Sequence, residues 1–148
     1  MRIAGGLILA MALVAPALAQ DANSAFFADN AKAAGVHIIP GIQYKVLKSG
    51  PADGPQPRRS STIKVRYEGK FLNGRIFDSS KDGPEGTATF PLNRLISGWT
   101  TMLPMMRPGD EWLIWLPPEY AYGAAGKDII PPSTPLEFRI ELVEIVRD

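Results

Sequence analysis

Apolar and polar residues alternate along two stretches of the chain, and this alternation predicts β-strands. In Thr62–Leu72, the residues Ile63, Val65 and Tyr67 share one face, whereas charged residues share the other. Leu136–Leu142 has the same period of two. Because successive side chains of a strand point to opposite faces, each stretch should bury one face and expose the other.

Three shorter stretches are predicted to complete a sheet: Ile42–Leu47, Thr87–Leu92 and Glu111–Leu116. Asn73-Gly74 follows the longest strand, and this dipeptide is the strongest short signal for a hairpin. The chain is therefore expected to turn there and to return along Arg75–Asp78.

One stretch has the spacing of a helix. Ile96, Trp99 and Leu103 recur at i, i+3 and i+7, which places them on one face. Ser97 is predicted to cap this helix, and Pro104 is predicted to limit it.

With about five strands and one helix, the chain is predicted to adopt an α+β fold in which an antiparallel sheet wraps over a short helix. The helix and the inner face of the sheet should bury a common core. The predicted core residues are Val65, Phe90, Trp99, Trp112, Ile114, Phe138 and Ile140.

Alternation along Glu111–Leu116 turns two large apolar side chains, Leu113 and Trp115, away from this core. Solvent favours polar residues there, and an exposed apolar pair can mark a contact surface. A weak dimer contact is one interpretation. We predict instead that the preceding segment covers the pair with its own apolar residues, Phe26, Phe27, Ile38 and Ile39.

Leu116–Pro132 has neither helical nor strand periodicity, although it carries two tyrosines and two adjacent isoleucines. Proline pairs bracket it and restrict its backbone, and its aromatic and β-branched residues argue against disorder. Loops of this length in small domains are usually functional or disordered. We predict an ordered loop that lends Tyr122, Ile129 and Ile130 to a site. An Ω-like loop packed on its own side chains is the alternative.

The first 19 residues are typical of a secretory signal peptide. Arg2 precedes the apolar run Ile3–Val14, which is too short to span a bilayer as a helix. Ala17-Leu18-Ala19 fits the small-x-small cleavage pattern. We therefore predict cleavage after Ala19 and no stable membrane insertion afterwards; an uncleaved membrane anchor is the alternative.

The chain is predicted to have three parts: a signal peptide over residues 1–19, a lead-in over residues 20–40 and a single domain over residues 41–148. Within the lead-in, Ser24 is predicted to start a short helix that runs to about Ala34.

Charge and composition narrow the possible chemistry. Residues 1–19 contain one arginine and no acid, so removing them from 16 basic and 15 acidic residues leaves 15 of each. A neutral chain has no evident attraction for nucleic acid or anionic lipid. The chain has no cysteine and only one histidine, His37, so neither a catalytic triad nor a metal site is predicted. Two of the nearby carboxylates Asp78, Asp82 and Glu85 could act as the catalytic pair of a glycosidase. They lie in a turn, however, where acidic residues are common.

Several separated motifs occur in a fixed order and carry a resemblance. They are Val65-Arg66-Tyr67-Glu68-Gly69, Gly74-Arg75-Ile76-Phe77-Asp78-Ser79-Ser80, Ile96-Ser97-Gly98-Trp99, Tyr120-Ala121-Tyr122-Gly123 and Ile129-Ile130-Pro131-Pro132. Together they resemble the FKBP-type peptidyl-prolyl isomerases, the macrolide-binding immunophilins, from about Ile42 to Ile145. The lead-in is similar to that of exported bacterial members, which implies a periplasmic location after passage across the inner membrane.

The resemblance implies a half-barrel sheet around the short helix, with an apolar pocket between them. Trp99 would be the pocket floor, and Tyr122 and Ile130 would close it from the long loop. Asp78 would be the rim carboxylate, and Ala88 stands where a pocket wall is often aromatic. The implied walls are Tyr67, Phe77, Leu95, Ile96 and Phe138.

The implied activity is rotation about Xaa-Pro bonds during the folding of exported proteins, with Asp78, Tyr122, Phe77 and Tyr67 catalytic and the other pocket residues binding substrate. Partners would be proline-containing unfolded polypeptides and macrolide inhibitors, and no cofactor is implied. The alternative is a non-catalytic holdase that uses the same pocket to bind peptides.

Overall fold

The computed structural model describes residues 22–148 and divides them into two compact units, separated between Ala34 and Gly35. The predicted signal peptide and its cleavage site after Ala19 lie outside the described residues. In the first unit, residues 22–30 are helical and turns follow from Ala31. The helix therefore includes residues ahead of its predicted start at Ser24 and ends before its predicted limit at Ala34. No helix within residues 22–148 is long and apolar enough to cross a membrane.

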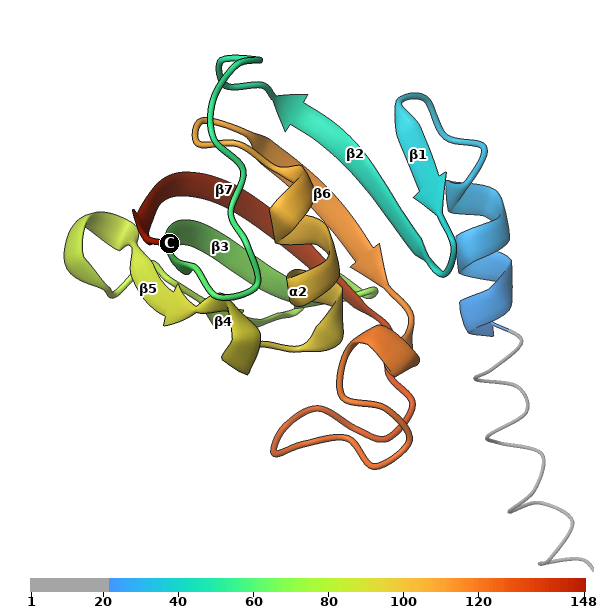
Figure 1. Ribbon diagram of the computed structural model, residues 1–148. Helices are drawn as coiled ribbons and strands as arrows, with labels where there is room; N and C mark the ends of the chain where they lie inside the picture. The colour runs from blue at the N-terminus through green and yellow to red at the C-terminus, as the bar shows by residue number, and fades with distance from the viewer. Residues whose placement is uncertain (1–21) are drawn as a thin grey trace, which may run out of the picture. The chain divides into compact units, whose positions relative to one another are not determined.

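A seven-stranded antiparallel sheet forms the frame of the second unit (Figure 1). Its order is β1-β2-β6-β7-β3-β4, and β5 also pairs with β3. The strands are β1 (Val36–Ile39), β2 (Ile42–Lys48), β3 (Thr62–Phe71), β4 (Ile76–Ser79), β5 (Ala88–Pro91), β6 (Glu111–Leu116) and β7 (Leu136–Arg147). The five predicted strands and the Asn73-Gly74 hairpin are confirmed, with Gly74 in the left-handed region at φ 91°.

Strand β1 lies in the segment that we assigned to the lead-in, so the sheet starts ahead of the predicted boundary at residue 41. Aromatic side chains account for part of this pairing. His37 of β1 stacks on Tyr44 of β2 with ring centroids 5.1 Å apart, and Tyr44 stacks on Trp112 of β6 at 4.7 Å. Such cross-strand aromatic contacts stabilise sheets.

The helix α2 (Ser97–Met102) lies across one face of the sheet and continues into the 3-10 turn η3 (Leu103–Met105) (Figure 1). The predicted capping role of Ser97 is wrong. Ile96 occupies the N-cap position, where no side chain caps the helix. The Ile96 carbonyl accepts the N–H groups of Trp99 and Thr100, so the helix starts on backbone bonds alone. Three further 3-10 turns are η1 (Pro84–Gly86), η2 (Leu92–Arg94) and η4 (Pro118–Tyr120).

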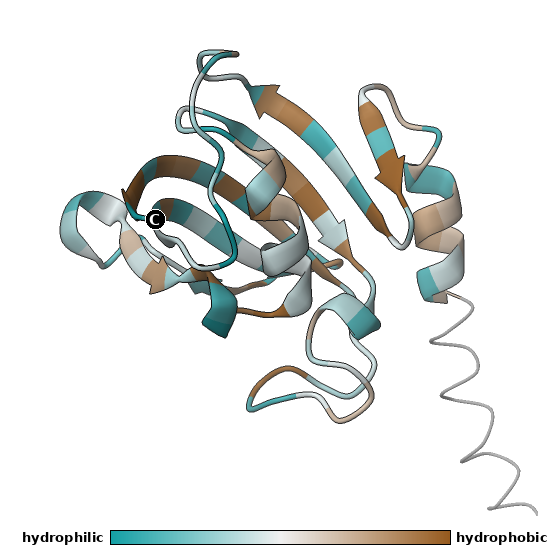
Figure 2. Ribbon diagram, viewed as in Figure 1, coloured by the Kyte–Doolittle hydropathy of each residue, from teal (hydrophilic) through white to brown (hydrophobic). Residues whose placement is uncertain are grey.

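The core lies between α2 and the sheet, and hydrophobic and hydrophilic bands alternate along the strands as a period of two requires (Figure 2). All predicted core residues are buried except Phe90, which is half-buried. Other fully buried residues were not on the predicted core list, although most of them lie in the predicted strands or the predicted helix. They include Ile42, Ile63, Leu92, Met102, Leu103, Met106, Leu136 and Leu142.

Trp115 points away from the core, as predicted, and it is nevertheless buried. Its side chain is only 5 % exposed, and its indole N–H donates to the Glu137 carboxylate at 2.8 Å. Glu137 lies directly opposite Trp115 on β7, so the one polar group of the indole is satisfied within the sheet. Ile38 is 60 % exposed and does not form the predicted cover, whereas Ile39 packs against the core. For Phe26 and Phe27, which belong to the other unit, the prediction stays a prediction.

We predict that Gly98→Ala destabilises the fold, although alanine normally favours a helix over glycine. A β-carbon at Gly98 would overlap the side chain of Leu116 and lie 2.8 Å from the carbonyl oxygen of Tyr120. Overpacking of this kind costs about 1–3 kcal/mol. Urea denaturation measures the loss, with Thr101→Ala on the exposed face of α2 as the control. A Gly98→Ala variant as stable as the Thr101→Ala variant would contradict this packing.

Candidate active site

A cavity of about 230 Å³ lies where α2 meets the sheet and the β6–β7 loop. It gathers residues that are far apart in the sequence, including all the predicted site residues except Ile129 and Ile130. Its lining is Tyr67, Phe77, Asp78, Phe90, Arg94, Leu95, Ile96, Trp99, Tyr122, Lys127 and Phe138. Ile130 is buried and lines an adjoining hollow of about 180 Å³, together with Phe77, Asp78 and Tyr122.

Trp99, in the first turn of α2, is the centre of an aromatic cluster at this cavity. Its ring meets Tyr67, Phe90 and Phe138 edge to face, with centroids 5.3, 6.2 and 5.5 Å away. Phe77 meets Phe138 in the same way at 5.7 Å. Edge-to-face contact is a preferred geometry for aromatic rings, so the cluster gives the cavity a rigid apolar wall.

Gly69 on β3 makes room for two of these rings. A β-carbon there would lie 2.7 Å from the Phe77 ring and 2.9 Å from the Phe138 ring. Phe138 is directly opposite Gly69 on β7, so the missing side chain lets both phenylalanines approach β3. Gly69 belongs to one of the sequence motifs, but no role was predicted for it.

Tyr67 and Asp78 form the polar contact of the cavity. The Tyr67 hydroxyl donates to Oδ2 of Asp78 at 2.8 Å, and this bond orients the Tyr67 ring. Burial raises the pKa of Tyr67, and the hydrogen bond to Asp78 and its negative charge raise that pKa further. Burial also raises the pKa of Tyr122, with smaller contributions from Asp78 and Asp128. Both phenols are therefore neutral donors at physiological pH.

Two donors at the cavity are available to a ligand. Within residues 22–148, neither the Tyr122 hydroxyl nor the Ile96 backbone N–H has a hydrogen-bond acceptor. Ile96 lies just before α2, and Tyr122 comes from the β6–β7 loop. The cavity can therefore offer hydrogen bonds to carbonyl groups from two separate segments.

Ser80 holds the edge of β3 beside the site, a role that the sequence analysis missed. β4 and β5 pair with different parts of this edge and leave Tyr67 between them. The Ser80 hydroxyl accepts the Tyr67 N–H at 2.9 Å and donates to the Gly86 carbonyl at 2.8 Å. The backbone N–H of Ser80 also donates to the Tyr67 carbonyl, so one residue satisfies the backbone that carries Tyr67.

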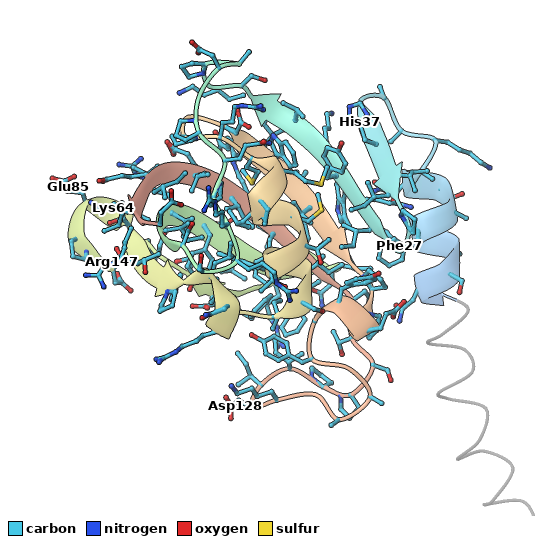
Figure 3. All side chains as sticks on the ribbon, viewed as in Figure 1. Phe27, His37, Lys64, Glu85, Asp128 and Arg147 are labelled. Carbon is cyan, nitrogen blue, oxygen red and sulfur yellow. The ribbon has the colours of Figure 1, made fainter. Side chains whose placement is uncertain are left out.

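The β6–β7 loop contains internal hydrogen bonds, which support the prediction of an ordered loop. The backbones of Lys127 and Ile130 bond to each other in both directions, at 3.0 and 2.8 Å, and Asp128 lies at the tip of the loop (Figure 3). Tyr122 lines the main cavity. Ile129 lines only the smaller hollow and is 63 % exposed.

Three lining residues were not predicted: Phe90, Arg94 and Lys127. The resemblance implied that Ala88 occupies a wall position that is often aromatic in the family, but Ala88 does not line the cavity. Phe90, on the same strand, supplies an aromatic ring instead. The period of two already placed Phe90 on the inner face, so that signal was available. Arg94 and Lys127 follow no period and carry no such signal.

Comparison with known proteins agrees with this architecture. The sequence model of one family, described as FKBP-type peptidyl-prolyl cis-trans isomerase, matches residues 54–143. The chain belongs to this family, and its fold is the α+β FKBP fold.

Among curated relatives, the peptidyl-prolyl cis-trans isomerase Mip of Coxiella burnetii is 40% identical over 128 residues, which are 84% of this chain and 54% of the relative. The FKBP-type 22 kDa peptidyl-prolyl cis-trans isomerase of Escherichia coli is 39% identical over 82% of this chain and 58% of its own length. The outer membrane protein MIP of Legionella longbeachae is 36% identical over 83% of this chain and 52% of that protein. The chain thus spans about half the length of these relatives.

Similar solved structures include the following two. A peptidyl-prolyl cis-trans isomerase from Pseudomonas syringae has a TM-score of 0.76 at 38% identity and covers 84% of this chain and 91% of its own. FkpA from Escherichia coli has a TM-score of 0.80 at 32% identity, over 86% of this chain and 59% of its own.

We predict that Ser80→Ala lowers the free energy of unfolding by about 1–3 kcal/mol, because it leaves the Tyr67 N–H and the Gly86 carbonyl without a partner. Chemical denaturation measures the loss, and amide hydrogen exchange at Tyr67 localises it. Ser79→Ala is the control, since that hydroxyl makes only a 3.4 Å contact with the Lys81 N–H. Equal stability of the two variants would refute the bridging role of Ser80.

We also predict that Asp78→Asn lowers the pKa of Tyr67, because the substitution removes the negative charge beside the phenol. A raised pKa in the folded state stabilises the protein below the unfolded value of about 10, and this contribution is lost as the pH rises through the folded value. Alkaline titration of labelled tyrosine rings by NMR follows each phenol. Asp128→Asn is the control, since Asp128 acts on Tyr122 and not on Tyr67. An unchanged Tyr67 titration in Asp78→Asn would show that the charge has no effect.

Proposed function

We propose that this chain is a peptidyl-prolyl cis-trans isomerase that accelerates rotation about Xaa-Pro bonds. The observation that carries this proposal is the convergence of Trp99, Tyr67, Phe77 and Phe138 on one apolar cavity with unpaired donors. Membership of the family supports the same activity.

The reaction needs a site of this kind and no reactive group. Rotation out of the amide plane removes resonance and meets a barrier of about 18–20 kcal/mol. Uncatalysed exchange at Xaa-Pro bonds takes roughly tens to hundreds of seconds. No bond forms or breaks, so catalysis requires only that the site bind the twisted amide more tightly than the planar one.

The apolar wall supplies the first part of that preference. A proline ring placed against the Trp99 indole would leave water and bring the preceding amide into an apolar surround. The planar amide has more charge separation than the twisted one, because resonance moves charge from nitrogen to oxygen. Removal from water therefore costs the planar ground states more than it costs the transition state.

Hydrogen bonds supply the second part. We assign the Tyr122 hydroxyl and the Ile96 N–H to substrate carbonyl groups, where they fix the chain on both sides of the rotating bond. Asp78 holds the Tyr67 ring in place through its hydrogen bond, and its negative charge contributes to the electrostatic field at the mouth of the cavity. A thousandfold acceleration requires only about 4 kcal/mol of preference for the transition state.

For the substrates, we propose unfolded, proline-containing polypeptides in the periplasm, which this protein would reach after cleavage behind Ala19. The signal-like pattern of residues 1–19 supports export, as does the name of the Legionella longbeachae relative, an outer membrane protein. We further propose that macrolide inhibitors compete for the same cavity, because their binding would need the apolar wall and the same two donors.

We predict that Asp78→Ala combined with Tyr122→Phe lowers kcat/KM about 10- to 100-fold, since one hydrogen bond is worth about 0.5–1.5 kcal/mol and bonds with charged groups more. A protease-coupled proline isomerisation assay on residues 20–148 measures the change, with and without a macrolide. Asp82→Ala is the control, because Asp82 is an exposed acid outside the cavity.

Unchanged activity in the double variant would refute the assigned roles. Protection of a proline-free substrate from aggregation by a protein without isomerase activity would overturn the proposed function in favour of a holdase.

A further inference from the structure

Three charged side chains line the cavity, and two of them are cations. Asp78 already accepts the Tyr67 hydroxyl. Arg94 and Lys127 are exposed, and neither has an ion-pair partner within residues 22–148. Peptide carbonyl groups do not need a cation, so the proposed reaction leaves both charges unexplained.

Four basic residues of β3 and β7 are paired. On β3, Lys64 bonds to Glu144, Arg66 to Glu141 and Lys70 to Glu68, at 3.3, 3.1 and 3.2 Å. Arg139 on β7 pairs with Glu111. The two cations at the cavity therefore differ from these in being available to a charged ligand.

Both cations project from segments with a fixed backbone. Arg94 ends η2, where the Leu95 N–H donates to the Leu92 carbonyl at 3.2 Å, and it lies two residues before Ile96. Lys127 is held by its two backbone bonds to Ile130. The charges therefore sit close in sequence to the segments that supply the donors Ile96 and Tyr122.

The charge is also unevenly placed along the site. Arg94 lines only the main cavity, Lys127 lines both hollows, and Asp128 lines only the smaller one. The main cavity thus carries two cations against the single carboxylate of Asp78. A peptide held there by its carbonyl groups would place the side chains beside its proline within this positive field.

We propose that Arg94 and Lys127 give this isomerase a preference for proline segments with an acidic residue adjacent to the proline. This inference rests on the proposed function, because it concerns the peptide bound in the same cavity. Exposed ion pairs change an equilibrium about two- to fivefold and are screened by salt. We therefore expect a graded preference and not an absolute requirement.

The test compares peptides of the form Ala-Xaa-Pro-Ala and Ala-Ala-Pro-Xaa in which Xaa is Glu, Gln or Lys. NMR exchange spectroscopy measures isomerisation without a coupling protease that has its own preference. At low ionic strength, we expect kcat/KM for Glu to exceed that for Gln by about two- to fivefold in at least one series. The ratio should approach one at about 1 M salt, where the Debye length is about 3 Å.

Substitutions identify the residues responsible. Arg94→Gln and Lys127→Gln should each reduce the Glu-to-Gln ratio, and Arg94→Glu should shift the preference towards Lys. The ratio within one variant cancels any general loss of activity. Arg59→Gln is the control, because it removes an exposed cation that does not line the cavity.

A second measurement separates this inference from the proposed function. The Trp99 indole resonance reports occupation of the cavity, so titration gives the affinity for each peptide. If the protein is active but its Glu-to-Gln ratios of kcat/KM are near one in both series, the proposed charge preference is wrong and the proposed isomerase activity stands. Tighter binding of Glu peptides by protein without isomerase activity overturns the isomerase and retains the preference. If the Glu-to-Gln ratio is unchanged by the Arg94 and Lys127 substitutions, these two residues are not the source of the preference.

Discussion

Edge-to-face packing around Trp99 is the contact on which both the core and the candidate site depend. One face of the helix turn that carries Trp99 belongs to the core, and its indole also meets Tyr67, Phe90 and Phe138 from three different strands. The same rings that hold the helix on the sheet therefore form the cavity wall. Stability and the shape of the site cannot be varied independently, because the same rings determine both. Next to Trp99, Gly98 is enclosed by other groups, the Leu116 side chain and the Tyr120 carbonyl.

Local patterns predicted much of the fold because its strands have one buried face. Alternation identified β3, β6 and β7 together with their inner sides, and Asn73-Gly74 identified the hairpin. The failures have a common cause, since a period states which side chains share a face but not what they meet. Trp115 points to the predicted side and is nevertheless buried. Ser97 is a good capping residue, yet the carbonyl of Ile96 takes the first bonds of the helix.

The site was less accessible to reasoning from the residues alone. Its walls come from strands, a helix and a loop that are separated in the sequence, and no spacing rule brings them together. The resemblance to a family supplied that convergence, and most of the implied residues line the cavity. The resemblance also implied a wall position at Ala88, although the aromatic ring on that strand comes from Phe90. Arg94 and Lys127 were missed because isolated charges on turns are ordinary in any sequence.

Both outer edges of the sheet are made of short pieces. β1 forms one edge, β4 and β5 share the other, and each is four residues long. Between β4 and β5, Ser80 occupies the backbone groups that an incoming chain would need. Short and interrupted edges are poor templates for adding a strand. For the unfolded polypeptides that we propose as substrates, this arrangement would leave the cavity open to them but offer their exposed strands no long free edge on which to aggregate.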